Sequence, residues 1–94
     1  MNNIIWGLQL VDIGFKNFID EKRVIKILTP DTTRAKFFIR EAVEGNSLID
    51  GTQGRKTNSI IILNTGHIVL SNISFTAIKK KFSFAGKLSW FYQI

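Results

Sequence analysis

The chain has 94 residues, a length that allows one domain with a core of limited size. It contains no cysteine, which excludes disulfides, cysteine-based zinc sites and thiol catalysis. Thirteen lysine and arginine residues against seven acidic residues give a formal net charge of +6, and no acidic residue follows Ser59. This excess favours an anionic partner, although solubility alone also explains it.

The amino-terminal sequence MNNIIWGLQL has no basic start, no long apolar segment and no small-residue cleavage site. We therefore do not expect a secretory signal. No apolar run reaches the length of a membrane span. The sequence predicts a cytoplasmic protein with no membrane partner.

Short strands are predicted in the first third of the chain. Residues 8–13 and 18–19 are expected to form a hairpin around the turn Gly14-Phe15-Lys16-Asn17. A polar bend, residues 20–23, leads to residues 24–28, whose Val-Ile-Lys-Ile-Leu sequence has good strand propensity. A Thr-Pro-Asp turn ends this strand.

A helix with clear periodicity follows this turn. Its apolar side chains recur at i, i+3, i+4, i+7 and i+8, a spacing that places them on one face: Ala35, Phe38, Ile39, Ala42 and Val43. Asp31 or Thr32 can cap the start of the helix, and Gly45-Asn46 can end it.

The most apolar run in the chain extends from Ile60 to Leu63. Four consecutive aliphatic residues, three of them β-branched, favour a strand that is buried on both faces. The turn residues 64–66 and the apolar run 67–71 then predict a return strand. The expected result is a β-hairpin, preceded by a polar and basic loop at residues 51–58.

A second, shorter helix is expected from a cap at Ser74 to Phe82. Its apolar residues share one face, and Lys79, Lys80 and Lys81 project around the rest. The remaining residues, 83–94, form an aromatic tail that is too apolar to stay in water alone. We expect it to add an edge strand or to cover a neighbouring subunit. The predicted organisation is one α+β domain, residues 1–82, with mostly antiparallel strands and two helices, followed by this tail.

The sequence contains no recognisable catalytic motif. The loop Gly51–Thr57 differs from a Walker A motif, which requires Gly-Lys-Ser/Thr with four residues between its glycines, because Arg55 interrupts it and the spacing is short. His67 is the only histidine and has no catalytic partner at a recognisable spacing. Glu41 and Glu44 have no histidine nearby for a metal site. We expect no enzyme activity, cofactor, metal or small-molecule substrate.

The segment LIDGTQGRKTNSIIILNTGHIVLS, residues 48–71, resembles the RemA family of bacterial regulators of extracellular-matrix genes. The likeness covers roughly residues 8–82 and includes Ile13-Gly14-Phe15, Asn17, Arg23-Val24-Ile25, Pro30-Asp31, Ile39 and Glu41-Ala42. The resemblance implies a LytTR-related DNA-binding domain. It also implies a homo-oligomer, a closed ring that is an octamer by resemblance, with duplex DNA wrapping on its basic residues.

The resemblance assigns DNA contact to Arg55, Lys56 and Arg23. The chain departs from the family at Lys56, which replaces an arginine and keeps the charge without the bidentate geometry. It also departs at Asn58, where the family commonly has another arginine. A further departure, Ser74-Phe75-Thr76-Ala77 in place of a Gln-Pro-Glu-Thr-like opening of the last helix, leaves the ring size open.

The sequence leaves open the role of the three consecutive lysines and the function of the chain as a whole. Lys79, Lys80 and Lys81 are additional DNA-binding candidates by our own inference, but a solvated helix face also explains them. The chain as a whole is predicted to be a DNA-binding transcriptional regulator. The alternative is a self-assembling structural subunit whose basic surface binds RNA or nothing specific.

Overall fold

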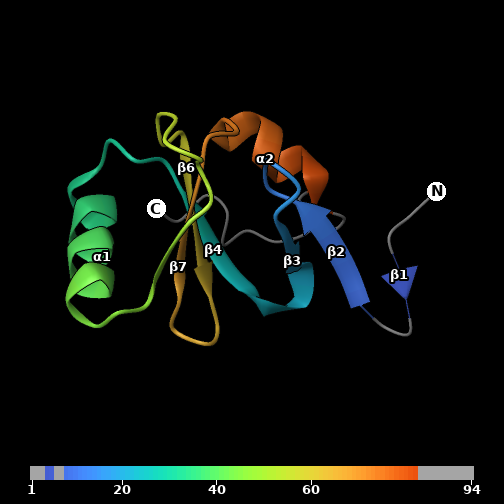
Figure 1. Ribbon diagram of the computed structural model, residues 1–94, viewed down its shortest axis with the longest axis horizontal. Helices are drawn as coiled ribbons and strands as arrows, with labels where there is room; N and C mark the ends of the chain where they lie inside the picture. The colour runs from blue at the N-terminus through green and yellow to red at the C-terminus, as the bar shows by residue number, and fades with distance from the viewer. Residues whose placement is uncertain (1–3, 6–7, 83–94) are drawn as a thin grey trace.

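The computed structural model describes residues 4–5 and 8–82 as two β-sheets and two α-helices (Figure 1). In chain order the elements are β1 (Ile4–Ile5), β2 (Leu8–Asp12), β3 (Phe18–Asp20), a short 3-10 helix η1 (Glu21–Arg23), β4 (Val24–Leu28), α1 (Thr33–Glu44), β5 (Leu48–Asp50), β6 (Ser59–Leu63), β7 (Ile68–Ser71) and α2 (Phe75–Lys81). The predicted α+β class, with mostly antiparallel strands and two helices, is confirmed. The predicted aromatic tail lies outside the described residues.

The strands form a three-stranded sheet of order β1-β2-β3 and a four-stranded sheet of order β4-β6-β7-β5. β6 pairs antiparallel with both β4 and β7, whereas β5 pairs parallel with β7. The hairpins β2–β3 and β6–β7 agree with the sequence prediction. β5 is not predicted from the sequence, because three residues show no clear period and the parallel partner is reached through a crossover.

Local chemistry explains the limits of α1. The Thr32 hydroxyl accepts a hydrogen bond from the Ala35 amide at 3.0 Å, and the Gly45 amide donates to the Glu41 carbonyl at 3.0 Å. Both predicted ends are confirmed. One predicted core position is wrong, since Val43 is 57% exposed. At about 100° per residue it lies about 80° around the axis from Ala35, at the border of the apolar stripe.

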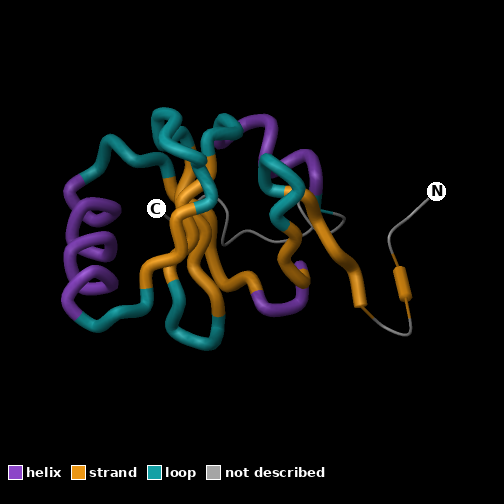
Figure 2. The backbone as a smooth tube through the Cα atoms, viewed as in Figure 1, coloured by secondary structure: helices purple, strands orange, loops and turns teal. Residues whose placement is uncertain are grey.

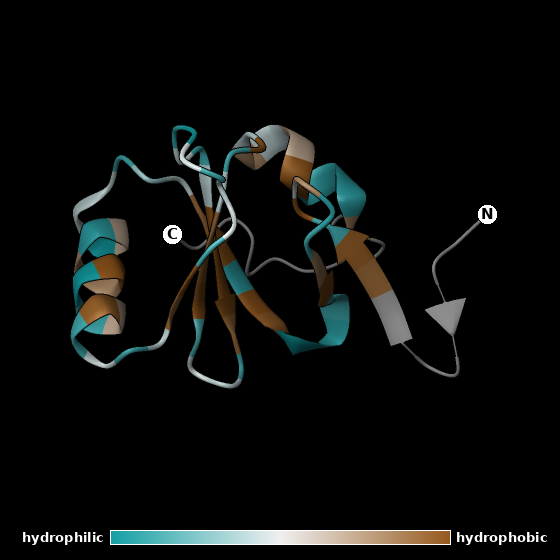
Figure 3. Cartoon of the chain, viewed as in Figure 1, coloured by the Kyte–Doolittle hydropathy of each residue, from teal (hydrophilic) through white to brown (hydrophobic). Residues whose placement is uncertain are grey.

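The four-stranded sheet is covered on both faces, by α1 on one side and by α2 with the β2–β3 hairpin on the other (Figure 1). Ile60 packs in the cluster that contains Ala35 and Ala42, whereas its neighbour Ile61 packs with Ile78. Both isoleucines are fully buried, which confirms the prediction of a strand buried on both faces. Figure 3 shows these central strands as the most hydrophobic part of the chain, with polar loops at their ends.

Candidate nucleic-acid interface

The basic loop, residues 51–58, connects β5 to β6 and is anchored to the sheet at both ends. At its start, the Gly51 amide donates to the Leu70 carbonyl at 2.9 Å. At its end, the Asn58 amide donates to the Ser71 carbonyl at 2.8 Å, and the Asn58 side-chain amide donates to the Asn72 carbonyl at 2.7 Å. Asn58, where the resemblance implies an arginine, therefore holds the loop in place.

A tight turn at the tip of the loop exposes the two predicted cations. Gln53 and Gly54 have φ values of 54° and 79°, and the Arg55 amide donates to the Thr52 carbonyl at 2.9 Å. Arg55 and Lys56 follow this turn directly and are both exposed. Because the turn is closed by hydrogen bonds, it presents these two side chains from a defined backbone.

Asp50 stabilises the first half of the loop. Its Oδ1 accepts hydrogen bonds from the Thr52 hydroxyl at 2.6 Å and from the Thr52 amide at 2.9 Å. These two hydrogen bonds lower the pKa of the Asp50 carboxyl, the one from the Thr52 hydroxyl most strongly and the one from the Thr52 amide next. Slight desolvation of the carboxyl raises its pKa but does not outweigh them. The Thr52 side chain itself is buried, so the residue whose carbonyl closes the turn is held in place by packing.

A second loop, the β2–β3 turn, lies beside the basic loop. Figure 2 shows both at one end of the strands, opposite the β6–β7 turn. The Arg55 guanidinium carbon lies 5.8 Å from the centroid of the Phe15 ring, within the range of a cation–π contact. Phe15 is 42% exposed and its neighbour Lys16 is exposed as well. Sequence reasoning placed both in a turn but had no signal that this turn meets a loop 40 residues away along the chain.

Arg23 lies at the opposite end of the sheet from Arg55. Its carbonyl accepts a hydrogen bond from the Asn64 amide at 2.7 Å, in the β6–β7 turn. The basic loop enters the other end of β6, which is five residues long. Four steps of about 3.4 Å separate those ends by ~14 Å. The structure therefore does not bring Arg23 together with Arg55 and Lys56 within one chain.

The lysines of α2 lie near its carboxyl end. Lys79 Nζ is 5.0 Å from the centroid of the Phe75 ring on the same helix, and Lys80 and Lys81 are exposed. α2 begins next to the basic loop, because the Ser59 hydroxyl donates to the Ile73 carbonyl at 2.7 Å. At 1.5 Å per residue the lysines are ~8–11 Å further along the helix axis than its cap at Ser74. They therefore lie beyond the start of α2, and the described contacts do not bring them together with the turn that carries Arg55 and Lys56.

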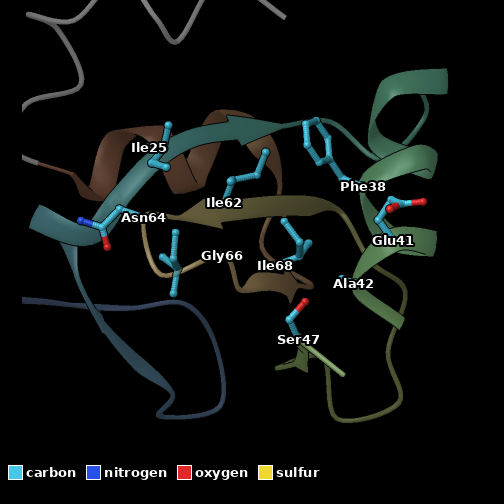
Figure 4. Close-up of a pocket in the computed structure, with 10 residues that line it drawn as sticks. Ile25, Phe38, Glu41, Ala42, Ser47, Ile62, Asn64, Gly66 and Ile68 are labelled. Carbon is cyan, nitrogen blue, oxygen red and sulfur yellow. The ribbon is translucent and has the colours of Figure 1, made fainter. Parts of the chain in front are cut away.

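An apolar groove of about 310 Å³ lies between α1 and the α1-facing side of the four-stranded sheet (Figure 4). It is a second surface, away from the basic loop. Its walls include Phe38 and Ala42 from α1 and Ile25, Ile62 and Ile68 from the strands. Ile25 is 48% exposed, so α1 leaves part of this sheet face uncovered. Glu41 of α1 also lines the groove.

Metal ligands and membrane-spanning helices are absent from the described part of the chain. Residues 4–5 and 8–82 contain no group of three or more histidine, cysteine, aspartate or glutamate side chains placed to hold a metal ion. In the same residues, no helix has both the length and the apolar character needed to cross a membrane.

The fold and the loop define a small, basic α+β protein that presents cations from anchored turns. Residues 10–82 match the model of the RemA-like family, described as extracellular matrix regulatory protein A-like. The chain belongs to this family, as its resemblance predicts. Family membership places it among regulatory proteins.

Individual relatives agree with this assignment, and each is named "putative regulatory protein". The relative from Dictyoglomus thermophilum is 45% identical over 64 residues, which cover 68% of this chain and 75% of that protein. The relative from Cyanothece sp. is 40% identical over 75 residues, covering 80% and 82%. The relative from Nitratidesulfovibrio vulgaris is 40% identical over 77 residues, covering 82% and 90%.

Proposed function

We propose that this protein is a cytoplasmic DNA-binding regulator of extracellular-matrix genes. It assembles into a ring and binds or wraps duplex DNA through repeated basic loops. Membership of the RemA-like family supports the regulatory role. The DNA-binding part of the proposal rests on one observation, the exposure of Arg55 and Lys56 on a loop whose two ends are bound to the sheet.

The chemistry of these two side chains matches phosphate. Arginine offers a planar fork that can bind two phosphate oxygens, and lysine offers a compact charge. The anchored backbone reduces the ordering that binding would otherwise require, so more of the contact energy contributes to affinity. An electrostatic interface of this kind reads the shape and deformability of DNA more than base identity.

The small number of contacts in one protomer supports the proposal of assembly. Each neutralised phosphate contributes about −0.9 to the slope of log K against log salt, so Arg23, Arg55 and Lys56 alone give a slope no steeper than about −3. A ring repeats these contacts along one duplex and raises affinity by avidity. Because Arg23 and the basic loop are far apart, they cannot form a single phosphate pocket. Their separation fits a duplex that runs along the protein surface and contacts both.

We assign the apolar groove to contact between protomers. Its exposed Ile25 and half-buried Ile62 and Phe38 would be removed from water in such an interface, which is favourable. Glu41 gives the groove a negative charge, and a second copy of this chain of net charge +6 brings positive charge to it. A ring needs two different surfaces to meet, as a concave groove and a separate face on the next copy would.

The test is the affinity for duplex DNA across a salt series, for the parent and for the double variant Arg55→Ala/Lys56→Ala. The matched control is Arg34→Ala/Lys36→Ala, which removes the same pair of residue types from an exposed stretch of α1. We expect the first variant to bind more weakly and with a shallower salt slope, and the control to bind like the parent. All three should have similar melting temperatures, since the four side chains are exposed.

Two results would contradict the proposal. If both double variants lose affinity equally, total charge and not the basic loop determines binding. If the parent binds single-stranded RNA as tightly as duplex DNA, with no preference for longer DNA, the alternative of a structural subunit with a generally basic surface is favoured.

A further inference from the structure

The backbone of the β2–β3 turn is strained at the two residues that it exposes. Phe15 and Lys16 have φ values of 54° and 62°, a left-handed conformation that is an outlier for a bulky residue. The Asn17 amide donates to the Gly14 carbonyl at 3.0 Å and closes the turn between them. Two consecutive left-handed residues are normally asparagine, aspartate or glycine. This turn instead places an aromatic ring and an ammonium group at its tip.

The surrounding structure holds this turn in place. The Gly14 amide donates to Asp12 Oδ1 at 2.8 Å, and the Asn17 side-chain amide donates to the Gly14 carbonyl at 3.0 Å. A Cβ atom on Gly14 would come within 2.9 Å of Asn72 Oδ1, so the turn packs closely against the residues that follow β7. Strained conformations of this kind persist where the fold over-determines them, and they cluster at functional sites.

We propose that Phe15 and Lys16 form a second DNA-contacting element beside the basic loop. Lys16 contacts a phosphate, and Phe15 makes an apolar contact with the bases and sugars of the minor groove where the bound duplex is bent. This inference rests on the proposed function and adds a contact that reads DNA deformability. Phosphate binding by Arg55 needs no aromatic neighbour, whereas apolar side chains next to cations are how bent duplexes are contacted at their flexible steps.

The left-handed backbone makes a clean experiment possible. Glycine adopts φ > 0 without strain, so Phe15→Gly and Lys16→Gly remove each side chain while the turn is kept. The matched control is Asn46→Gly, which relieves a similar conformation, φ 58°, at an exposed and uncharged position after α1, outside both loops. Melting temperatures of all three variants should equal or exceed that of the parent. Phe15→Asn serves as a second variant if Phe15→Gly fails to fold.

Salt dependence separates the two roles. Phe15→Gly should weaken duplex binding at every salt concentration by at least about fivefold, the low end for removing one aromatic side chain from a base, with an unchanged slope. Lys16→Gly should make the slope shallower by about 0.9 for each phosphate that Lys16 neutralises in the parent. Asn46→Gly should bind like the parent. Duplexes with 2-aminopurine at a TA step should brighten on binding the parent but not Phe15→Gly.

Parent-like binding by Phe15→Gly and Lys16→Gly would overturn the inference. So would a loss in Phe15→Gly that disappears in the Arg55→Ala background, because Phe15 would then act only by orienting Arg55. Failure of the proposed function looks different. If the parent does not bind duplex DNA, both the proposed function and this inference are wrong. If Arg55→Ala/Lys56→Ala binds normally and Phe15→Gly binds weakly, only the assignment of DNA contact to the basic loop is wrong.

Discussion

The Ser71 hydroxyl donates a hydrogen bond to the Ile13 carbonyl at 2.6 Å, across 58 residues of sequence. The same oxygen accepts a hydrogen bond from the Ile73 amide at 3.1 Å. Ser71 is fully buried at the end of β7, and Ile13 leads directly into the β2–β3 turn. One side chain thus joins the first hairpin to the four-stranded sheet and to the start of α2, and it brings Phe15 towards the basic loop.

Ser71→Ala is expected to destabilise the fold by about 1–3 kcal/mol, because it leaves the Ile13 carbonyl and the Ile73 amide without this partner. The measurement is urea unfolding, with a lower midpoint at an unchanged m-value. Thr76→Ala is the control, since it removes an exposed hydroxyl from α2 and should change the free energy of unfolding by no more than about 0.5 kcal/mol. Equal decreases in the free energy of unfolding for the two variants would show that the Ser71 hydrogen bond contributes no more to stability than an exposed hydroxyl does.

Several elements of the fold are predictable from the sequence because local chemistry determines them. Thr32 and Gly45 mark the ends of α1, Ser74 caps α2, and the run beginning at Ile60 favours a buried strand. In each case a side-chain type has a strong preference for one local conformation.

Long-range relations are the part that sequence reasoning missed. β5 pairs in parallel with β7, which lies further along the chain, and its three residues carry no pattern of their own. The contact between Phe15 and Arg55 joins residues 40 positions apart, and no local rule indicates it or the nearby Ser71 bond. The separation of Arg23 from the basic loop follows from the antiparallel pairing of β4 with β6. The basic residues that the sequence groups together therefore lie on two distinct surfaces.

Acid is expected to destabilise the basic loop through Asp50. Because the hydrogen bonds from Thr52 lower the pKa of Asp50 in the folded state, its contribution to stability is full above the unfolded pKa of about 3.9 and is lost as the pH falls through the folded value. Asp50→Asn retains an oxygen acceptor but cannot be protonated in this range. Unfolding free energies measured from pH 6 to pH 2.5 should fall more steeply for the parent than for Asp50→Asn. Parallel curves would contradict this role.

Lys56→Arg is expected to tighten duplex binding by about two- to fivefold, since an exposed charged contact is worth roughly 0.5–1 kcal/mol and the arginine fork adds a second hydrogen bond. The charge is unchanged, so the slope of log K against log salt should stay the same. Lys36→Arg on α1 is the matched control. An equal gain at both positions would mean that arginine strengthens binding anywhere on the surface and that Lys56 does not meet a phosphate.

Ile25→Glu is expected to weaken assembly while the protomer stays folded. Ile25 is 48% exposed in the protomer, so a carboxylate there can remain in water, but burying it in an interface without a partner costs several kcal/mol. Light scattering should give a ring mass for the parent and a lower mass for Ile25→Glu, with similar melting temperatures. Ile49→Glu is the control, because Ile49 is 45% exposed on β5, away from the groove.

DNA binding provides a second measurement for the same variant. If the groove holds the ring together, Ile25→Glu should lose the preference for long duplexes and its salt slope should approach the single-protomer limit of about −3. The basic loop is intact in this variant, so weak binding to short duplexes should persist. Dissociation by Ile49→Glu instead would place the protomer contact at the β5 edge. A parent that is monomeric at all concentrations would contradict the ring itself, because avidity then has no source.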